Sequence, residues 1–454
     1  MFCSEADANT PIHLLTADEL DRLLPDLPLP QQAWVQTSEF TAEPGAWLAV
    51  PGTEGQLARV LCGRQDGDDL WALATLPAQI PGGDYTLVGD FGPEGQELLQ
   101  LGWALGHYQF DRYKPAPASK ARLALPSGQA DRVQALVEAT MLTRDLVNTP
   151  ASDLGPAELA EAARALAERF GADFSCVEGE RLEREFPAIH VVGQASSRAP
   201  RLIRMQWGEE DAPPLALVGK GVIFDSGGLD IKPGAGMVLM KKDMGGAAHV
   251  LGLAQLIMAL GLKVNLRVYI PAVENAISGN AYRPSDIIRT RNGTSVEIGN
   301  TDAEGRVVLS DALTLACEEG AERVIDFATL TGAARIALGE DLPPLYARST
   351  SQARAIQDRS FELQDPLWHM PLFEGYRNQI QPTIADLSNT GTSKFGGSLT
   401  AALFLDHFVD EGIDWMHLDV YAWNLGNRPG RPAGGEAQGL RAIFDWLETT
   451  YGGP

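Results

Sequence analysis

Four carboxylates beside glycine-rich turns are the residues of this sequence best suited to chemistry. Each falls at the end of an apolar run or at the start of a predicted helix, and they are Asp225, Asp243, Asp302 and Glu304. Their four negative charges would balance two divalent cations, and oxygen ligands suit Mg²⁺, Mn²⁺ or Zn²⁺. A water molecule between two such ions becomes hydroxide near neutral pH and attacks a carbonyl. The pattern therefore makes a two-metal hydrolase a working hypothesis.

Each of these acids also has an ordinary structural interpretation, because acids often cap helices or stabilise turns. Asp302 and Glu304 fit it well, since a helical pattern begins just after them. Capping does not account for the glycine pairs at 227–228 and 245–246, nor for the neighbouring cations. These cations are Lys220, Lys232, Lys241, Lys242 and Arg306. A cation in such a place would be able to hold the oxyanion that develops during hydrolysis.

Other catalytic patterns are absent from the sequence. It contains no GxxxxGK[ST], no GxSxG and no HExxH motif. The seven histidines are dispersed, which argues against a zinc site built from histidine. A single histidine on an apolar segment, such as His249 or His417, is more often a structural residue.

The composition limits the classes of partner and compartment. The 454 residues include 36 Lys+Arg and 60 Asp+Glu, a net charge of −24 that repels phosphate backbones and makes nucleic acid an unfavoured partner. The four cysteines form no CxxC motif, which is typical of a reducing compartment. The sequence shows no signal peptide and no apolar run of about 18 residues, so we expect a cytoplasmic protein without a membrane span.

The order of apolar runs predicts an α/β fold in two parts. Residues 1–125 carry short apolar runs and a helical segment near 94–108, which predicts a smaller N-terminal α/β domain for packing and assembly. Residues 126–454 are expected to form a larger catalytic domain that includes a connecting helix at about 130–147. Strands are predicted at 189–192, 202–205, 215–218, 222–224, 264–270, 324–328 and 415–420, and helices at 156–170, 246–260, 307–317 and 399–409. This alternation indicates a mostly parallel sheet covered by helices, with ligands beyond the carboxyl ends of its strands.

Several motifs in one order resemble the leucyl (cytosol) aminopeptidase family of two-metal exopeptidases. The most specific is the heptapeptide Asn300-Thr-Asp-Ala-Glu-Gly-Arg306. It is accompanied by Gly-Lys-Gly at 219–221, Phe-Asp-Ser-Gly-Gly at 224–228, Ile-Lys-Pro at 231–233 and Lys-x-Asp-Met-x-Gly-Ala at 241–247. The similarity covers roughly residues 140 to 425, whereas the first 125 residues match only in general character.

The resemblance implies a metal and a catalytic role for particular residues. The metal ligands would be Lys220, Asp225, Asp243, Asp302 and Glu304. Asp225 and Glu304 would bridge two ions, with Mn²⁺ or Zn²⁺ expected first and Mg²⁺ or Co²⁺ as alternatives. Lys232 would polarise the substrate carbonyl, and Arg306 would hold a bicarbonate ion that acts as general base towards the bridging water. Lys220 must be neutral to donate, which needs a pKa lowered by at least ~3 units, and two adjacent dications would supply that shift.

The resemblance also implies the substrate. A free α-amino group would ligate a metal, which restricts cleavage to the N-terminal residue of a peptide. The side-chain pocket would use Met240, Thr329, Leu330, Gly332, Tyr421 and Asn424. Many relatives carry a small residue after the segment 417–419, where this chain continues with Val420-Tyr-Ala-Trp-Asn424. The resemblance therefore specifies the reaction more firmly than a preference for leucine, and an alternative interpretation of Tyr421 is a core aromatic residue.

The family assembles as a homohexamer, which is the expected state here. Two other functions remain as hypotheses. A non-catalytic scaffold or DNA-binding regulator predicts eroded ligands or a basic groove, and a different two-metal hydrolase, such as a phosphatase, predicts phosphate release without peptide cleavage.

Overall fold

The chain folds into two compact units in the computed structural model, which describes residues 1–65, 67, 70–126, 128 and 130–452. The smaller unit comprises Met1–Met141 and Leu425–Ala433, and the larger comprises Leu142–Asn424 and Gly434–Pro454. The division falls within helix α4 (Ala130–Asn148), the connecting helix expected from the sequence. The domain boundary that we expected at residues 125/126 stays a prediction.

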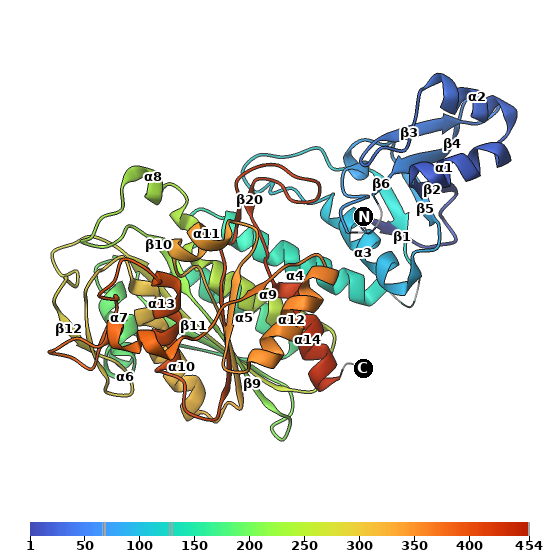
Figure 1. The fold of residues 1–454 in the computed structure, drawn as a ribbon. Coiled ribbons are helices and arrows are strands. Elements are labelled where there is room, and N and C mark those ends of the chain that lie inside the picture. Colours follow the sequence, from blue (N-terminus) through green and yellow to red (C-terminus); the bar gives the residue numbers. More distant parts are fainter. Residues whose placement is uncertain (66, 68–69, 127, 129, 453–454) are drawn as a thin grey trace. The chain divides into compact units, whose positions relative to one another are not determined.

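The smaller unit is built on a mixed sheet with the strand order β1-β6-β5-β2-β4-β3 (Figure 1). Neighbouring strands are parallel except for β3, which is antiparallel to β4. The strands are β1 (Phe2–Cys3), β2 (Thr10–Leu15), β3 (Trp47–Pro51), β4 (Leu57–Gly63), β5 (Gly83–Val88) and β6 (Ala121–Ala124). The helices are α1 (Ala17–Leu23), η1 (Leu24–Asp26), α2 (Leu29–Thr37), η2 (Leu76–Ala78) and α3 (Gly92–Leu105).

Alternation along β4 explains why helices cover both faces of this sheet. Val60 and Cys62 belong to one apolar cluster, which also contains Trp103 of α3. Leu61 belongs to a second cluster with residues of α1 and α2. Successive side chains of a strand point to opposite faces, so the run of consecutive apolar residues 60–62 needs cover on both sides.

The larger unit is organised around a sheet with the order β16-β15-β18-β14-β9-β11-β8-β7, and β10 also pairs with β11. Its strands are β7 (Asp173–Glu178), β8 (Arg201–Trp207), β9 (Pro214–Gly219), β10 (Gly221–Asp225), β11 (Asn265–Asn275), β14 (Arg323–Ala328), β15 (Pro344–Ala347), β16 (Trp368–His369) and β18 (Asp414–Asp419). The central strands β18, β14, β9, β11 and β10 are parallel to one another. Antiparallel pairs occur towards the edges, between β11 and β8, β8 and β7, and β15 and β18.

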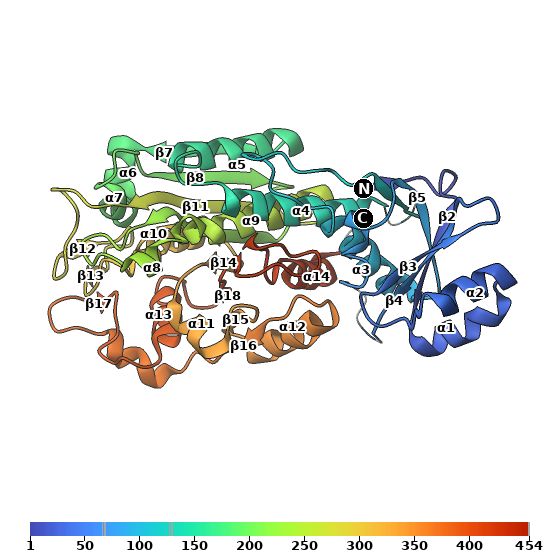
Figure 2. The same cartoon turned by 90° about the horizontal axis from the view of Figure 1, so that it is seen from above.

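Helices cover both faces of the larger sheet, as Figure 2 shows. Helix α9 (Gly245–Ala259) packs on β9 and β14, and it also contacts α5 (Pro156–Phe170) and α14 (Leu440–Tyr451), which contacts α12 (Thr350–Glu362). On the opposite face, α10 (Glu304–Glu318) packs on β9 and β11 and contacts α7 (Pro187–Gly193) and α13 (Gly397–Asp406). The α/β prediction, with a smaller N-terminal part and a larger, mostly parallel and helix-covered sheet, is therefore confirmed.

Short elements complete the larger unit around the ends of the central strands. They are α6 (Gly179–Glu185), α8 (Gly234–Met237), η3 (Met240–Met244), α11 (Gly332–Leu338), η4 (Glu374–Ile380), β12 (Ile287–Arg289), β13 (Ser295–Glu297), β17 (Leu387–Ser388), β19 (Trp423–Asn424) and β20 (Gly434–Gly435). Strands β12, β13 and β17 form a small sheet, and β19 pairs with β20.

One predicted strand is wrong: residues 189–192 lie in helix α7. Pro187 occupies the first turn, and the carboxylate of Asp311 accepts hydrogen bonds from the backbone amides of Ala188 and Ile189. An amide donor at a helix N-terminus has no partner within the helix, so this distant acid satisfies donors that a strand would have paired otherwise.

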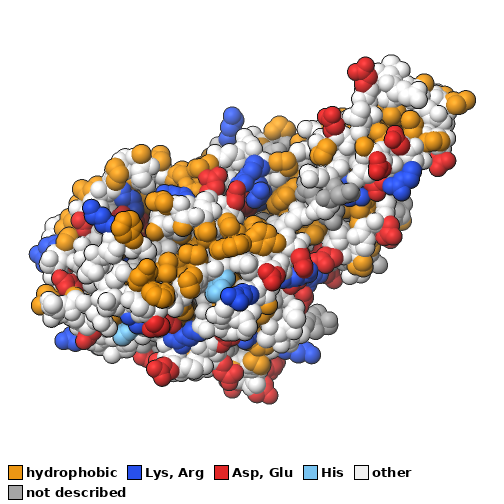
Figure 3. All heavy atoms as spheres, in the orientation of Figure 1, with side chains coloured by type: hydrophobic (Ala, Val, Ile, Leu, Met, Phe, Trp, Pro, Cys, Tyr) orange, Lys and Arg blue, Asp and Glu red, His pale blue; other side chains and the backbone are white. Residues whose placement is uncertain are grey.

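The surface of the larger unit mixes side chains of every type, as the face in Figure 3 shows. Its most exposed large apolar side chains include Val238, Ile336 of α11 and Phe395. Within the described residues, no helix combines the length and the apolar composition needed to cross a lipid bilayer.

Candidate active site

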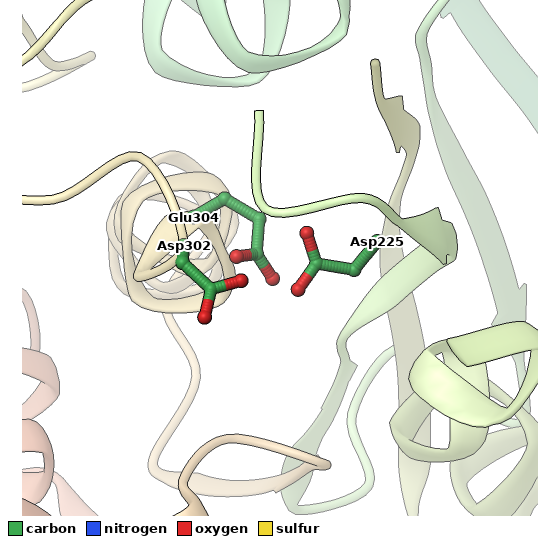
Figure 4. A group of neighbouring side chains, drawn as sticks. All are labelled: Asp225, Asp302 and Glu304. Atoms are coloured by element: carbon green, nitrogen blue, oxygen red, sulfur yellow. The ribbon is translucent and has the colours of Figure 1, made fainter. Parts of the chain in front are cut away.

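Three carboxylates converge at the carboxyl ends of the central strands. Asp225 is the last residue of β10, Glu304 is the first residue of α10, and Asp302 lies in the turn before that helix. One oxygen from each of the three lies within 4.8 Å of the others, and Figure 4 shows the carboxylate groups turned towards one another. We call Asp225, Asp302 and Glu304 the carboxylate cluster.

Two lysines hold this cluster together. The Nζ atom of Lys220, which follows β9, lies 2.8 Å from an oxygen of Asp243 and 2.8 Å from one of Glu304. The Nζ atom of Lys232 lies 2.8 Å from Asp225 and 2.5 Å from Asp302. The structure therefore brings together all five predicted metal ligands and Lys232, with Asp243 joined to the cluster through Lys220.

The turn after β10 is shaped so that Asp225 faces the cluster. Gly227 has a φ of +87°, and a Cβ atom there would lie 2.4 Å from the carbonyl oxygen of Asp230. The amide of Gly227 donates to Asp225 at 2.9 Å, and the side chain of Asn275 donates to the same oxygen at 2.8 Å. A second amide hydrogen of Asn275 is donated to the backbone carbonyl of Thr301 at 3.0 Å. This one side chain thus ties the Asp225 turn to the loop that carries Asp302.

Burial and charge crowding shift the acid–base properties of the cluster. Burial, followed by repulsion from Glu304 and Asp243, raises the pKa of Asp225 well above its usual value. Burial also raises the pKa of Asp243 to about 6. Burial would raise the pKa of Glu304 as well, but the ammonium of Lys220 outweighs it and holds that pKa below its usual value. The Lys220 pKa in turn is raised, because Asp243 and Glu304 outweigh the opposite effect of its burial.

The donor set fits divalent cations. Oε2 of Glu304 is buried and has no hydrogen-bond partner among the described residues, whereas Oδ2 of Asp243, Oδ1 of Asp302 and Oε1 of Glu304 have only a lysine ammonium beside them. A buried carboxylate oxygen without a hydrogen bond is costly unless a cation satisfies it. Four carboxylates face only two ammonium groups here, so the site has an excess of negative charge and of oxygen ligands, which suits hard or borderline dications.

Arg306 is buried in the first turn of α10, and one N–H group of its guanidinium is already hydrogen-bonded. Its Nη1 atom donates to the backbone carbonyl of Asn389 at 2.7 Å, whereas its buried Nε–H has no acceptor among the described residues. Burial lowers the pKa of Arg306 to about 10, which leaves the group positively charged at neutral pH. The Nε–H is therefore able to donate to a small anion.

The predicted pocket residues follow two paired strands. Thr329, Leu330 and Gly332 come after β14, and Tyr421 comes after its parallel neighbour β18. The hydroxyl of Thr329 donates to the carboxylate of Asp243 at 2.8 Å, and the amide of Leu330 donates to Asp419 at 2.9 Å. Gly332 begins α11 and borders open space, because a Cβ atom there would meet nothing within 4 Å.

Met240, Tyr421 and Asn424 have different surroundings. Met240 begins η3 and is half-buried. The ring of Tyr421 is half-buried and contacts two cations, Lys242 and Arg335. Asn424 is almost fully buried, and its side-chain amide donates to the carboxylate of Glu436.

Sequence reasoning missed the residues that support this site. Asn275 ends β11, and the sequence pattern had ended that strand at residue 270, before its polar end. Asn389 accepts a hydrogen bond from the amide of Gly299 at 2.8 Å and donates to the carbonyl of Asn300 at 2.7 Å, although it lies far along the chain. A polar residue at the carboxyl end of a central parallel strand was the available signal for Asn275. No local signal marks Asn389.

Comparison with known proteins assigns both parts of the chain. Residues 141–444 match the model of the cytosol aminopeptidase family, catalytic domain, and residues 10–126 match the M17 aminopeptidase N-terminal domain. A probable cytosol aminopeptidase of Syntrophotalea carbinolica is 42% identical over 372 residues, which are 78% of this chain and 74% of that protein.

Solved structures agree with this match. The crystal structure of the cytosol aminopeptidase from Coxiella burnetii is 48% identical, covers 99% of both chains and superposes with a TM-score of 0.96. The bottromycin maturation enzyme BotP in complex with Mn is 31% identical, covers 98% of this chain and 100% of its own, and gives a TM-score of 0.88. The chain therefore belongs to the M17 cytosol aminopeptidase family and is a metal-dependent exopeptidase that releases N-terminal residues from peptides.

Proposed function

We propose that the enzyme removes N-terminal amino acids with two divalent ions held by Lys220, Asp225, Asp243, Asp302 and Glu304. The observation that carries this proposal is the excess of four neighbouring carboxylates over two lysine ammonium groups, which leaves Oε2 of Glu304 without a partner among the described residues. Mn²⁺ or Zn²⁺ would serve best, with Mg²⁺ or Co²⁺ as alternatives, and the solved structure of one relative is a complex with Mn. When bound, the ions would supply Lewis-acid chemistry, activating water and polarising the scissile carbonyl.

Lys220 would change its role when ions bind. In the protein alone, its ammonium supplies positive charge beside Asp243 and Glu304. Ions held by the same carboxylates would replace that charge and repel the ammonium, so Lys220 would act as a neutral nitrogen donor.

Lys232 would act on the substrate rather than on the ions. Its ammonium is only partly buried and lies against Asp225 and Asp302. Once those carboxylates are neutralised, Lys232 would be the cation able to donate to the oxyanion that develops on the scissile carbonyl.

Arg306 would hold a bicarbonate ion, which would supply a general base for the attacking water. The buried Nε–H without an acceptor supports this role, because a guanidinium binds a planar oxyanion through adjacent N–H groups. The hydrogen bond to Asn389 would fix the orientation of the guanidinium plane.

The substrates would be peptides with a free N-terminus, whose side chain enters the pocket formed by Met240, Thr329, Leu330, Gly332 and Tyr421. Asn424 would form one wall of this pocket, and its hydrogen bond to Glu436 would hold its side chain in place. We also propose that the enzyme is cytoplasmic and that it assembles as a homohexamer. Light scattering on the purified protein would test the hexamer.

Hydrolysis of aminoacyl p-nitroanilides with Mn²⁺, Zn²⁺, Co²⁺ or Mg²⁺ tests the function. Wild type should cleave free but not N-acetylated substrates, and Asp302→Ala and Lys232→Ala should each lower kcat/KM by at least ~100-fold. Lys263→Ala, which removes an exposed lysine, is the matched control and should retain activity. Metal-loaded wild type that releases no N-terminal residue would refute the proposal.

A further inference from the structure

Lys242 differs from every other lysine near the site. Only 5% of its surface is exposed, yet its ammonium forms no ion pair or hydrogen bond with a described residue. Lys220 and Lys232 pair with carboxylates, and Lys241 donates to the carbonyl of Asn148 at 2.6 Å. A buried ammonium is costly without a counter-charge, so its position needs an explanation.

The polar contact that Lys242 does make leaves its donors unused. Its Nζ atom lies 4.7 Å from the centroid of the Tyr421 ring. A ring face attracts the cation, but it does not satisfy the three N–H donors of an ammonium. The nearest acids are committed elsewhere, because Asp243 pairs with Lys220 and Asp419 accepts hydrogen bonds from Leu330 and Thr331.

A second cation faces the same ring. The Cζ atom of Arg335 lies 4.9 Å from the centroid of Tyr421, and this guanidinium also forms no ion pair within the described chain. Arg335 lies three residues after Gly332 on α11, so both project from the same side of that helix. Gly332 borders open space and Arg335 is exposed, so a ligand is able to approach this end of α11.

The backbone that carries the ring is held by hydrogen bonds. The amides of Tyr421 and Ala422 donate to the side chain of Gln438 at 3.0 and 2.8 Å. Ala422 has a φ of +57°, a conformation that a non-glycine residue adopts only when its surroundings enforce it. The group formed by Lys242, Arg335 and Tyr421, which we call the Tyr421 pocket, is therefore a built feature rather than a chance contact of exposed side chains.

We propose that the Tyr421 pocket selects substrates whose N-terminal residue is acidic, with glutamate preferred. This inference rests on the proposed function, in which Tyr421 borders the side-chain pocket. A glutamate side chain would offer Lys242 the carboxylate that it lacks, and Arg335 would add a second, more exposed attraction. A neutral side chain of equal size would leave the buried ammonium without a counter-ion, and a site that loses such a partner discriminates strongly.

The test compares kcat/KM for the p-nitroanilides of glutamate, glutamine and leucine with Mn²⁺-loaded enzyme. Glutamate and glutamine differ in charge but hardly in size, so their ratio isolates the carboxylate. Wild type should favour glutamate by at least ~10-fold, and Lys242→Met should lower the ratio to about 2–3, the contribution expected of Arg335 at low salt. Lys241→Met removes an equal charge from the adjacent residue and should leave the ratio within about twofold of wild type, because screening weakens its longer-range effect.

The outcomes separate this inference from the proposed function. Cleavage of leucine and glutamine substrates, with no preference for glutamate in wild type, would overturn the inference while leaving the aminopeptidase function intact. A Lys242→Met variant that loses activity on glutamate and glutamine in the same proportion would also overturn it, since that result indicates a structural role. No cleavage of any substrate would refute the function itself. If Lys242→Met does not fold, the wild-type ratio alone decides.

Discussion

The carboxylate cluster and the Tyr421 pocket both lie beyond the carboxyl ends of central strands of one sheet, but their charges are paired in opposite ways. In the cluster and its neighbour Asp243, every ammonium lies within 2.8 Å of two carboxylates. In the pocket, Lys242 and Arg335 share one aromatic ring and form no ion pair with a described residue. The cluster has an excess of carboxylates, and the pocket has an excess of cations.

This difference indicates which ligand each region would bind. A buried charge destabilises a fold unless a charge of opposite sign compensates it. The excess carboxylates would be completed by metal ions, and the excess cations by an acid of the substrate. The substitutions below therefore test each region by removing the charge that is in excess or the contact that positions it.

The largest effect is expected from Glu304→Gln, which removes a charge from the cluster and keeps its shape. Glu304 is buried, its Oε1 pairs with Lys220 and its Oε2 has no partner among the described residues, so the amide would offer a weaker ligand at a crowded position. We expect fewer than two ions per chain by elemental analysis and a kcat/KM lowered by roughly 1,000-fold, the size of effect seen when a charge-stabilising group is lost.

The other end of the same helix provides the matched control. Glu318 is the last residue of α10 and pairs with Arg291 near the surface. Glu318→Gln should retain both ions and activity. A Glu304→Gln enzyme that binds two ions and cleaves like wild type would remove this residue from the metal site.

A smaller effect, on stability, is expected where the cluster is positioned. Asn275→Ala would remove one of the two donors to Oδ1 of Asp225, leaving the Gly227 amide, and one of the two donors to the carbonyl of Thr301, leaving the Tyr282 hydroxyl. We expect the free energy of unfolding in urea to fall by about 1–3 kcal/mol in the presence of EDTA. Asn280→Ala, which removes an exposed amide bonded to Gln194, should change it by less than about 0.5 kcal/mol. Equal changes in the two variants would show that Asn275 does not position the cluster.

The sequence was a good guide to the fold because the central strands are buried on both faces. Such strands appear as uninterrupted apolar runs, and six of the seven predicted in the larger unit are strands here. The run at 189–192 has the same composition, and its helical state depends on Asp311, more than a hundred residues away. Short apolar runs cannot be assigned by periodicity alone, so this error has a physical origin.

The candidate site was predictable to the extent that its residues lie in continuous motifs. Lys220, Asp225, Lys232, Asp302 and Glu304 occupy short glycine-rich segments, and strand order alone places such segments together. The Tyr421 pocket was not predictable in that way. Its contacts join η3, α11 and the segment after β18. Whether these three segments meet depends on the register of β14 with β18 and on the strained backbone at Ala422.

The smallest expected effect distinguishes the two cations of the pocket. Arg335 is exposed whereas Lys242 is buried, so salt screens the attraction of Arg335 for a substrate carboxylate far more strongly. Arg335→Gln should lower the glutamate-to-glutamine ratio of kcat/KM by only about 2–3-fold at low salt, and the difference from wild type should vanish near 1 M NaCl. The effect of Lys242→Met should persist at that salt concentration, because a buried pair is screened less. If high salt abolishes the wild-type preference entirely, the selectivity comes from the surface field of the protein, and the buried ammonium does not contact the substrate.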